Sequence, residues 1–117
     1  MILKERSSTS GHVLTDSVRG IPAVLESNIT GAEDTSSDAA DIVQSFNSDG
    51  FQVGTSGRVN QSGQTYVAWC WKAGGAAVTN SDGSVDSQVS ANPAAGFSIV
   101  TYSGSGSRTI GHGLNRA

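Results

Sequence analysis

Short apolar runs along this chain are separated by clusters of turn residues, and several runs alternate between hydrophobic and polar positions. Alternation with a period of two is typical of a β-strand. No helix of normal length is predicted. The strand candidates are residues 1–5, 12–17, 23–26, 42–46, 51–54, 65–72, 77–79, 84–89, 96–102 and 109–114.

The most apolar of these segments, residues 65–72, contains both tryptophans and the only cysteine. Alternation places Val67, Trp69 and Trp71 on one face of the strand. Both faces are too apolar for an edge strand, so we predict that this strand lies at the centre of a sheet. We also predict that the two indole rings are mostly buried. Their expected contacts across the fold are Phe97 and Ile99, or Phe51.

Turn chemistry fixes the connections between strands. The sequence Asn-Ser-Asp-Gly occurs at 47–50 and at 80–83, and an Asp-Gly pair between apolar runs is a strong hairpin signal. Residues 31–41 are polar and acidic, and a loop is favoured there over one turn of helix. If eight or nine of these ten candidates form strands, their spacing predicts an all-β fold, a two-sheet antiparallel β-sandwich of jelly-roll or lectin-like type. At 117 residues we expect one such module over residues 1–117.

Charge and composition exclude several function classes. The net charge is −3 and the few basic residues form no patch, which argues against nucleic-acid binding. No apolar run reaches the length of a membrane span. One cysteine, Cys70, cannot form an internal disulfide.

Metal sites have weak support in the sequence. His12, His112 and Cys70 show no ligand spacing typical of zinc. The two Asn-Ser-Asp-Gly turns lack the spaced acids and the bidentate Glu of a calcium loop, and Asp is a common turn residue. We therefore expect neither a metal nor another cofactor.

Catalytic chemistry has equally weak support. The acidic loop could supply a carboxylate pair for glycoside hydrolysis, but its polar surroundings give no reason for the raised pKa that a general acid needs. The four carboxylates are Glu33, Asp34, Asp38 and Asp41. We expect no catalytic residues, and a protein that is not an enzyme.

A sugar-stacking platform is the alternative to a core role for the aromatic residues. Aromatic faces bind the C–H surfaces of sugars, and Trp69, Trp71 and Tyr66 are the candidate binding residues. The burial-prone neighbours of the tryptophans favour the core interpretation.

Several segments together resemble a module of large virion proteins of marine bacteriophages, which are tail-fibre-like or uncharacterised. The matching segments are Asp16-Ser17-Val18-Arg19-Gly20, Ala32-Glu33, Ser48-Asp49-Gly50-Phe51, Val53-Gly54, Asn60, residues 66–72, residues 96–102 and Gly111-His112-Gly113-Leu114. The resemblance implies a non-enzymatic structural and adhesive module of the virion, assembled in the host cytoplasm and extracellular after release. The implied partners are other virion proteins, copies of the chain and host surface glycans, without membrane insertion.

The resemblance also implies that the chain is one period of a longer repeat. We therefore predict that the strand at Ile2–Glu5 lies beside residues 109–114, or close enough for a short link to join the two. A free-standing carbohydrate-binding module of lectin-like type is the second hypothesis. A small glycosidase or lyase domain is a distant third.

Overall fold

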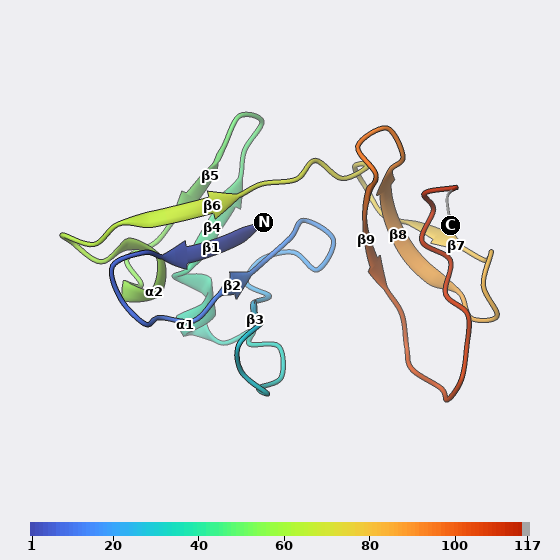
Figure 1. The fold of residues 1–117 in the computed structure, drawn as a ribbon, viewed down its shortest axis with the longest axis horizontal. Coiled ribbons are helices and arrows are strands. Elements are labelled where there is room, and N and C mark those ends of the chain that lie inside the picture. The colour runs from blue at the N-terminus through green and yellow to red at the C-terminus, as the bar shows by residue number, and fades with distance from the viewer. Residues whose placement is uncertain (116–117) are drawn as a thin grey trace. The chain divides into compact units, whose positions relative to one another are not determined.

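The computed structural model describes residues 1–115 and divides them into two compact units, Met1–Cys70 and a second unit that begins at Trp71 (Figure 1). Their strands form three sheets in which every paired strand runs antiparallel to its neighbour. Two helices of four residues each are the helical part of the described residues. These observations confirm the predicted all-β class.

The larger sheet belongs to the first unit and has the strand order β3-β2-β1-β6. In the longest pairing Leu3 lies opposite Ala68, and Ile2 lies opposite Trp69. The bounds are β1 (Ile2–Glu5), β2 (Val13–Leu14), β3 (Leu25–Glu26) and β6 (Tyr66–Trp69).

A β-hairpin follows in the same unit, formed by β4 (Val43–Phe46) and β5 (Phe51–Val53). Its turn is closed by the backbone N–H of Asn47, which donates to the carbonyl of Gly50 at 2.8 Å. The hairpin predicted from the Asp-Gly pair at 49–50 is thereby confirmed.

The two helices begin at serine caps. The Ser36 hydroxyl accepts from the backbone of α1 (Ser37–Ala40), and the Ser56 hydroxyl accepts from the backbone of α2 (Gly57–Asn60). A capped turn satisfies N–H groups that would otherwise lack partners, so one turn can form where propensity is modest. The sequence favoured a loop over 31–41, but this segment contains one turn of helix, α1.

The hydrophobic core of the first unit joins the sheet, the hairpin and both helices. Ile42 and Val13 are completely buried in it. Its other buried members are Leu3, Val24, Ala39, Val43 and Val59.

The predicted central position of residues 65–72 is wrong. β6 ends at Trp69 and lies at the edge of its sheet, with β1 as its neighbour. The core lies on the face of the sheet opposite to Trp69. Leu3 is buried on the core side, whereas Ile2, the partner of Trp69, alternates to the outer side. Trp69 and Trp71 are each 48% exposed, so the predicted burial is wrong as well.

The second unit contains a three-stranded sheet with β8 in the middle. Two irregular segments are tied to β8. The Ser90 hydroxyl accepts from the backbone N–H of Gly74 and donates to the carbonyl of Gly75, while the Ser87 hydroxyl donates to the carbonyl of Gly111. The strands are β7 (Val78–Asn80), β8 (Ser87–Asn92) and β9 (Phe97–Thr101).

The strand predicted over 109–114 is reduced to one bridge, in which Ile110 pairs in parallel with Val85. β1 pairs with β2 and β6. Both strands that pair with β1 belong to the first unit, and within the described residues no strand pairing joins Ile2–Glu5 to residues 109–114. Their proximity, and the single module over residues 1–117, stay predictions.

Candidate functional site

Tyr66 has a structural role in the first unit. Its hydroxyl donates to the carbonyl of Gly57 at 2.9 Å and accepts from the backbone N–H of Gln61 at 2.9 Å. These bonds join β6 to both ends of α2. The phenol of Tyr66 is thus held by protein groups, and its hydroxyl is not left over for a ligand.

Trp69 and Trp71 belong to different units, so each is considered in its own surroundings. Trp69 ends the edge strand β6 on the outer face of its sheet. Trp71 stacks on Phe97, with ring centroids 5.8 Å apart and ring planes at 18°. Offset stacking at this distance is favourable for two aromatic rings. Trp71 is therefore an exposed indole that a second aromatic ring supports from one side.

Polar contacts fix the backbone next to Trp71. The side chain of Asn92 donates to the carbonyl of Lys72 at 3.1 Å, and Asn92 lies opposite Phe97 in the pairing of β8 with β9. The Ser90 hydroxyl holds the next two peptides at Gly74 and Gly75. The chain that leaves Trp71 is thus anchored to the strand that also positions Phe97.

Three carboxylates of the acidic loop, those of Glu33, Asp34 and Asp41, each bind a different partner. Glu33 binds Arg19, and Asp34 accepts from the backbone of Ser36. The hydrogen bond from Ser36 lowers the pKa of Asp34, and hydrogen bonds from Thr55 lower the pKa of Asp41. A general acid needs the opposite shift, so these two carboxylates are unsuited to act as the acid in glycoside hydrolysis.

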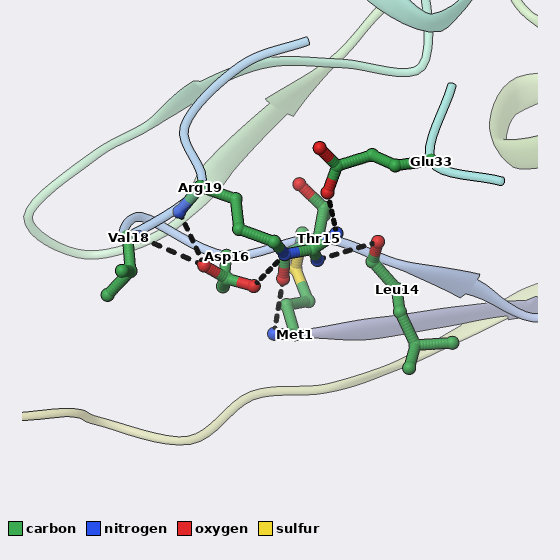
Figure 2. A network of polar contacts seen from close by, with 7 residues as sticks. All are labelled: Met1, Leu14, Thr15, Asp16, Val18, Arg19 and Glu33. Carbon is green, nitrogen blue, oxygen red and sulfur yellow. Dashed lines mark hydrogen bonds and ion pairs between the residues drawn. The ribbon is translucent and has the colours of Figure 1, made fainter. Parts of the chain in front are cut away.

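A polar network surrounds Arg19 in the segment Asp16–Gly20 (Figure 2). The Asp16 carboxylate accepts from the backbone N–H groups of Val18 and Arg19 at 3.0 and 2.9 Å. The guanidinium of Arg19 donates to Asp16 at 2.6 Å, to Glu33 at 2.7 Å and to the carbonyl of Leu14 at 3.2 Å. Because all three guanidinium nitrogens have acceptors, Arg19 ties the loop after β2 to the acidic loop and is not a free cation.

The pKa of Asp16 is held below its usual value. Burial alone would raise it, but the hydrogen bonds and the charge of Arg19, with the backbone N–H of Val18, outweigh burial. The carboxylate is therefore ionised throughout the neutral range and fixed in a structural pair.

Metal-ligand residues are not gathered within residues 1–115, where no group of three or more His, Cys, Asp or Glu side chains could hold an ion. The Nδ1 atom of His12 lies 3.1 Å from the Ser27 hydroxyl, and Cys70 is exposed and unpaired with another cysteine. In the same part of the chain, no helix is long and apolar enough to cross a membrane.

A small pocket in the second unit brings together two turns that are distant in the sequence. The turn at 80–83 connects β7 to β8, and residues 110–115 run beside it. The pocket measures about 280 Å³, and its lining is Asp82, Ile110, Gly111, His112, Gly113 and Asn115.

Reciprocal backbone contacts hold the two turns together. The N–H of Ser84 donates to the carbonyl of Thr109 at 2.9 Å, and the N–H of Thr109 donates to the Ser84 hydroxyl at 3.1 Å. The backbones approach closely enough to favour glycine, because a Cβ on Gly83 would lie 2.2 Å from the carbonyl oxygen of Thr109. A Cβ on Gly111 would lie 1.7 Å from Oδ1 of the Asn80 side chain. The sequence predicted each of the two glycine-containing turns, but it did not predict that the turns contact each other.

The polar groups of the pocket are arranged by neighbouring residues. Asn80 donates from its side chain to Oδ2 of Asp82 at 2.8 Å and accepts from the backbone N–H of Asp82 at 3.1 Å. The backbone N–H of Leu114 donates to Nδ1 of His112 at 3.1 Å. An accepting Nδ1 carries no proton, so we assign the ring proton of neutral His112 to Nε2. The pocket therefore combines a carboxylate acceptor with an imidazole donor.

The comparison with protein families gives one match that covers all of residues 1–117, to the family described as a domain of unknown function, DUF7483. The chain belongs to the DUF7483 family. No curated protein matches the chain, and no solved structure matches it. The DUF7483 assignment thus supplies a family without an activity.

Proposed function

We propose that the chain is a non-enzymatic structural and adhesive module of a bacteriophage virion, and that it contacts glycans of the host surface through Trp71. The observation that carries the adhesive part is the half-exposed indole of Trp71 stacked on Phe97. The virion part is supported by the resemblance of the segments quoted above to phage virion proteins.

A sugar platform needs an aromatic face that is rigid before the ligand arrives, because ordering a side chain on binding reduces affinity. The stack on Phe97 fixes one side of the Trp71 ring, and the bond from Asn92 to the Lys72 carbonyl fixes the adjoining backbone. About half of the residue remains accessible. A sugar ring can pack its C–H face on such a surface without rearrangement of the protein.

Partners within the virion are proposed to be other virion proteins or further copies of the chain. β6 and β9 are at the ends of their sheets, and neither contains a charged residue. Natural proteins often protect sheet edges with charges, because unpaired backbone groups recruit further strands. These neutral edges fit a module that joins neighbours. We also propose that its sheets pack as the layers of a sandwich of jelly-roll or lectin-like type.

Two measurements test the two parts of the proposal. Mass spectrometry and immunogold labelling of purified phage particles that encode this chain should find it on the virion, and its absence from particles would contradict the virion assignment. A free-standing carbohydrate-binding module, the second candidate, would bind glycans but be missing from the particles.

Glycan contact is tested by isothermal titration calorimetry of the full chain with soluble oligosaccharides, because the heat of binding can be measured whether or not Trp71 is present. Trp71→Ala should abolish binding. Trp69→Ala is the matched control, because the exposed fraction of Trp69 is also 48%. Binding that survives in Trp71→Ala would exclude this platform.

A further inference from the structure

We propose that the pocket between Asp82 and His112 binds one neutral sugar ring through two adjacent hydroxyl groups. This second site rests on the proposed glycan contact and extends it. Each site has its own residues and can fail without the other.

The size of the pocket limits the ligand. Sites for drug-sized ligands are usually about 300–1,000 Å³. At about 280 Å³ this pocket is slightly smaller than that range, which suits a single ring and not an extended oligosaccharide. The pocket therefore fits the terminal residue of a glycan chain.

The hydrogen-bonding groups match a pair of hydroxyls. Each hydroxyl can donate one hydrogen bond and accept others. Oδ1 of Asp82 can accept from one hydroxyl, since Oδ2 already accepts from Asn80. The Nε2–H of His112 can donate to the neighbouring hydroxyl, since Nδ1 is occupied by Leu114. The amide of Asn115 adds both a donor and an acceptor to the same lining.

The negative charge of the pocket lining favours a neutral sugar over an anionic one. The lining of the pocket includes the Asp82 carboxylate and no lysine or arginine, and the whole chain has a net charge of −3. A sugar carboxylate or phosphate would be repelled by Asp82. Ile110 supplies the apolar surface against which a C–H face can lie.

The pocket and the Trp71 platform involve opposite faces of the sheet. Gly113 approaches the side chains of Val89 and Ala91, which alternate to one face of β8. Trp71 stacks on Phe97, whose strand partner Asn92 points to the other face. One sugar ring cannot therefore occupy both sites.

The test is a titration of the isotope-labelled full chain with methyl glycosides of glucose, galactose and mannose, followed by NMR in the presence of a metal chelator. At least one glycoside should shift the amide signals of residues 80–83 and 110–115, with a dissociation constant on the order of 1 mM. Asp82→Asn should weaken binding at least about tenfold through loss of a charged acceptor. His112→Asn, which retains an acceptor near the position of Nδ1 but lacks Nε2–H, should weaken it similarly.

Asp86→Asn is the matched control, since Asp86 is an exposed aspartate of the same unit outside the pocket, and its binding should equal that of the unchanged chain. Three outcomes would overturn the inference: no shifts in these segments, a dissociation constant that is unchanged in Asp82→Asn, or tighter binding of glucuronate than of the neutral sugars. Shifts confined to Trp71 and Phe97 would overturn the pocket but support the platform. Shifts confined to the pocket would support this inference and contradict the platform.

Discussion

Gly111 and Asn80 lie so close together that a Cβ added to Gly111 would be 1.7 Å from Oδ1 of the asparagine. The contact brings the turn after β7 against the segment that contains His112. Gly111→Ala should therefore separate these segments and lower the free energy of unfolding by about 1–3 kcal/mol, as overpacking usually does. Urea unfolding of the full chain measures the change.

Gly104→Ala is the control for that substitution. A Cβ added to Gly104 would have no heavy atom within 4 Å, and the backbone of Gly104 is outside the left-handed region. Its free energy of unfolding should stay close to that of the unchanged chain. If both variants lost the same free energy of unfolding, the contact of Gly111 with Asn80 would not be the cause of the destabilisation in Gly111→Ala.

The stability of the first unit should depend on Ile42 more than on the large aromatic Trp69. Ile42 is fully buried, whereas Trp69 is 48% exposed at a sheet edge. Ile42→Ala should cost about 2–5 kcal/mol because it leaves a cavity, and Trp69→Ala about 1–2 kcal/mol. Thermal unfolding compares the two, and a larger loss for Trp69→Ala would contradict the placement of the core.

Acid should weaken the first unit through Asp16. Its pKa is lower in the folded chain than in the unfolded chain, so its stabilising contribution is complete above the unfolded value of about 4. The contribution is lost as the pH falls through the lower folded value. Asp16→Asn should therefore destabilise the chain clearly at pH 7, and the difference should shrink as the pH falls below the unfolded value and Asp16 becomes protonated.

Denaturant unfolding at a series of pH values measures this difference. A constant difference between Asp16→Asn and the unchanged chain from pH 7 to pH 2 would show that the pair of Asp16 with Arg19 does not contribute through charge. Arg19→Lys should resemble Asp16→Asn at pH 7, because lysine cannot donate to Asp16, Glu33 and the Leu14 carbonyl in the same fork.

Local sequence patterns predicted the approximate positions of most strands, but not the reduction of residues 109–114 to a single bridge. The hairpin at 47–50 and the apolar strand at 97–101 depend on neighbours in the sequence, and the sequence shows both. The position of β6 at a sheet edge depends on which strand pairs with β1, a long-range choice that the composition of residues 65–72 does not reveal. The two helices were hard to predict because a serine cap, not a periodic apolar face, starts each one.

The candidate sites were predictable only in part. Trp71 was singled out as a possible sugar-stacking residue, but its support by Phe97 follows from the pairing of β8 with β9. Asp82 and His112 each stood out only as turn residues. Their meeting depends on the contacts of Ser84 with Thr109 and of Gly111 with Asn80, which no local pattern contains.

The central claim is that the chain is an adhesive module whose Trp71 platform contacts glycans. A glycan array probed with the full chain, with Trp71→Ala and with Trp69→Ala tests it most directly. The account predicts selective binding by the unchanged chain, the same pattern for Trp69→Ala and loss of signal for Trp71→Ala. No binding by the unchanged chain, or an unaltered pattern for Trp71→Ala, would contradict it.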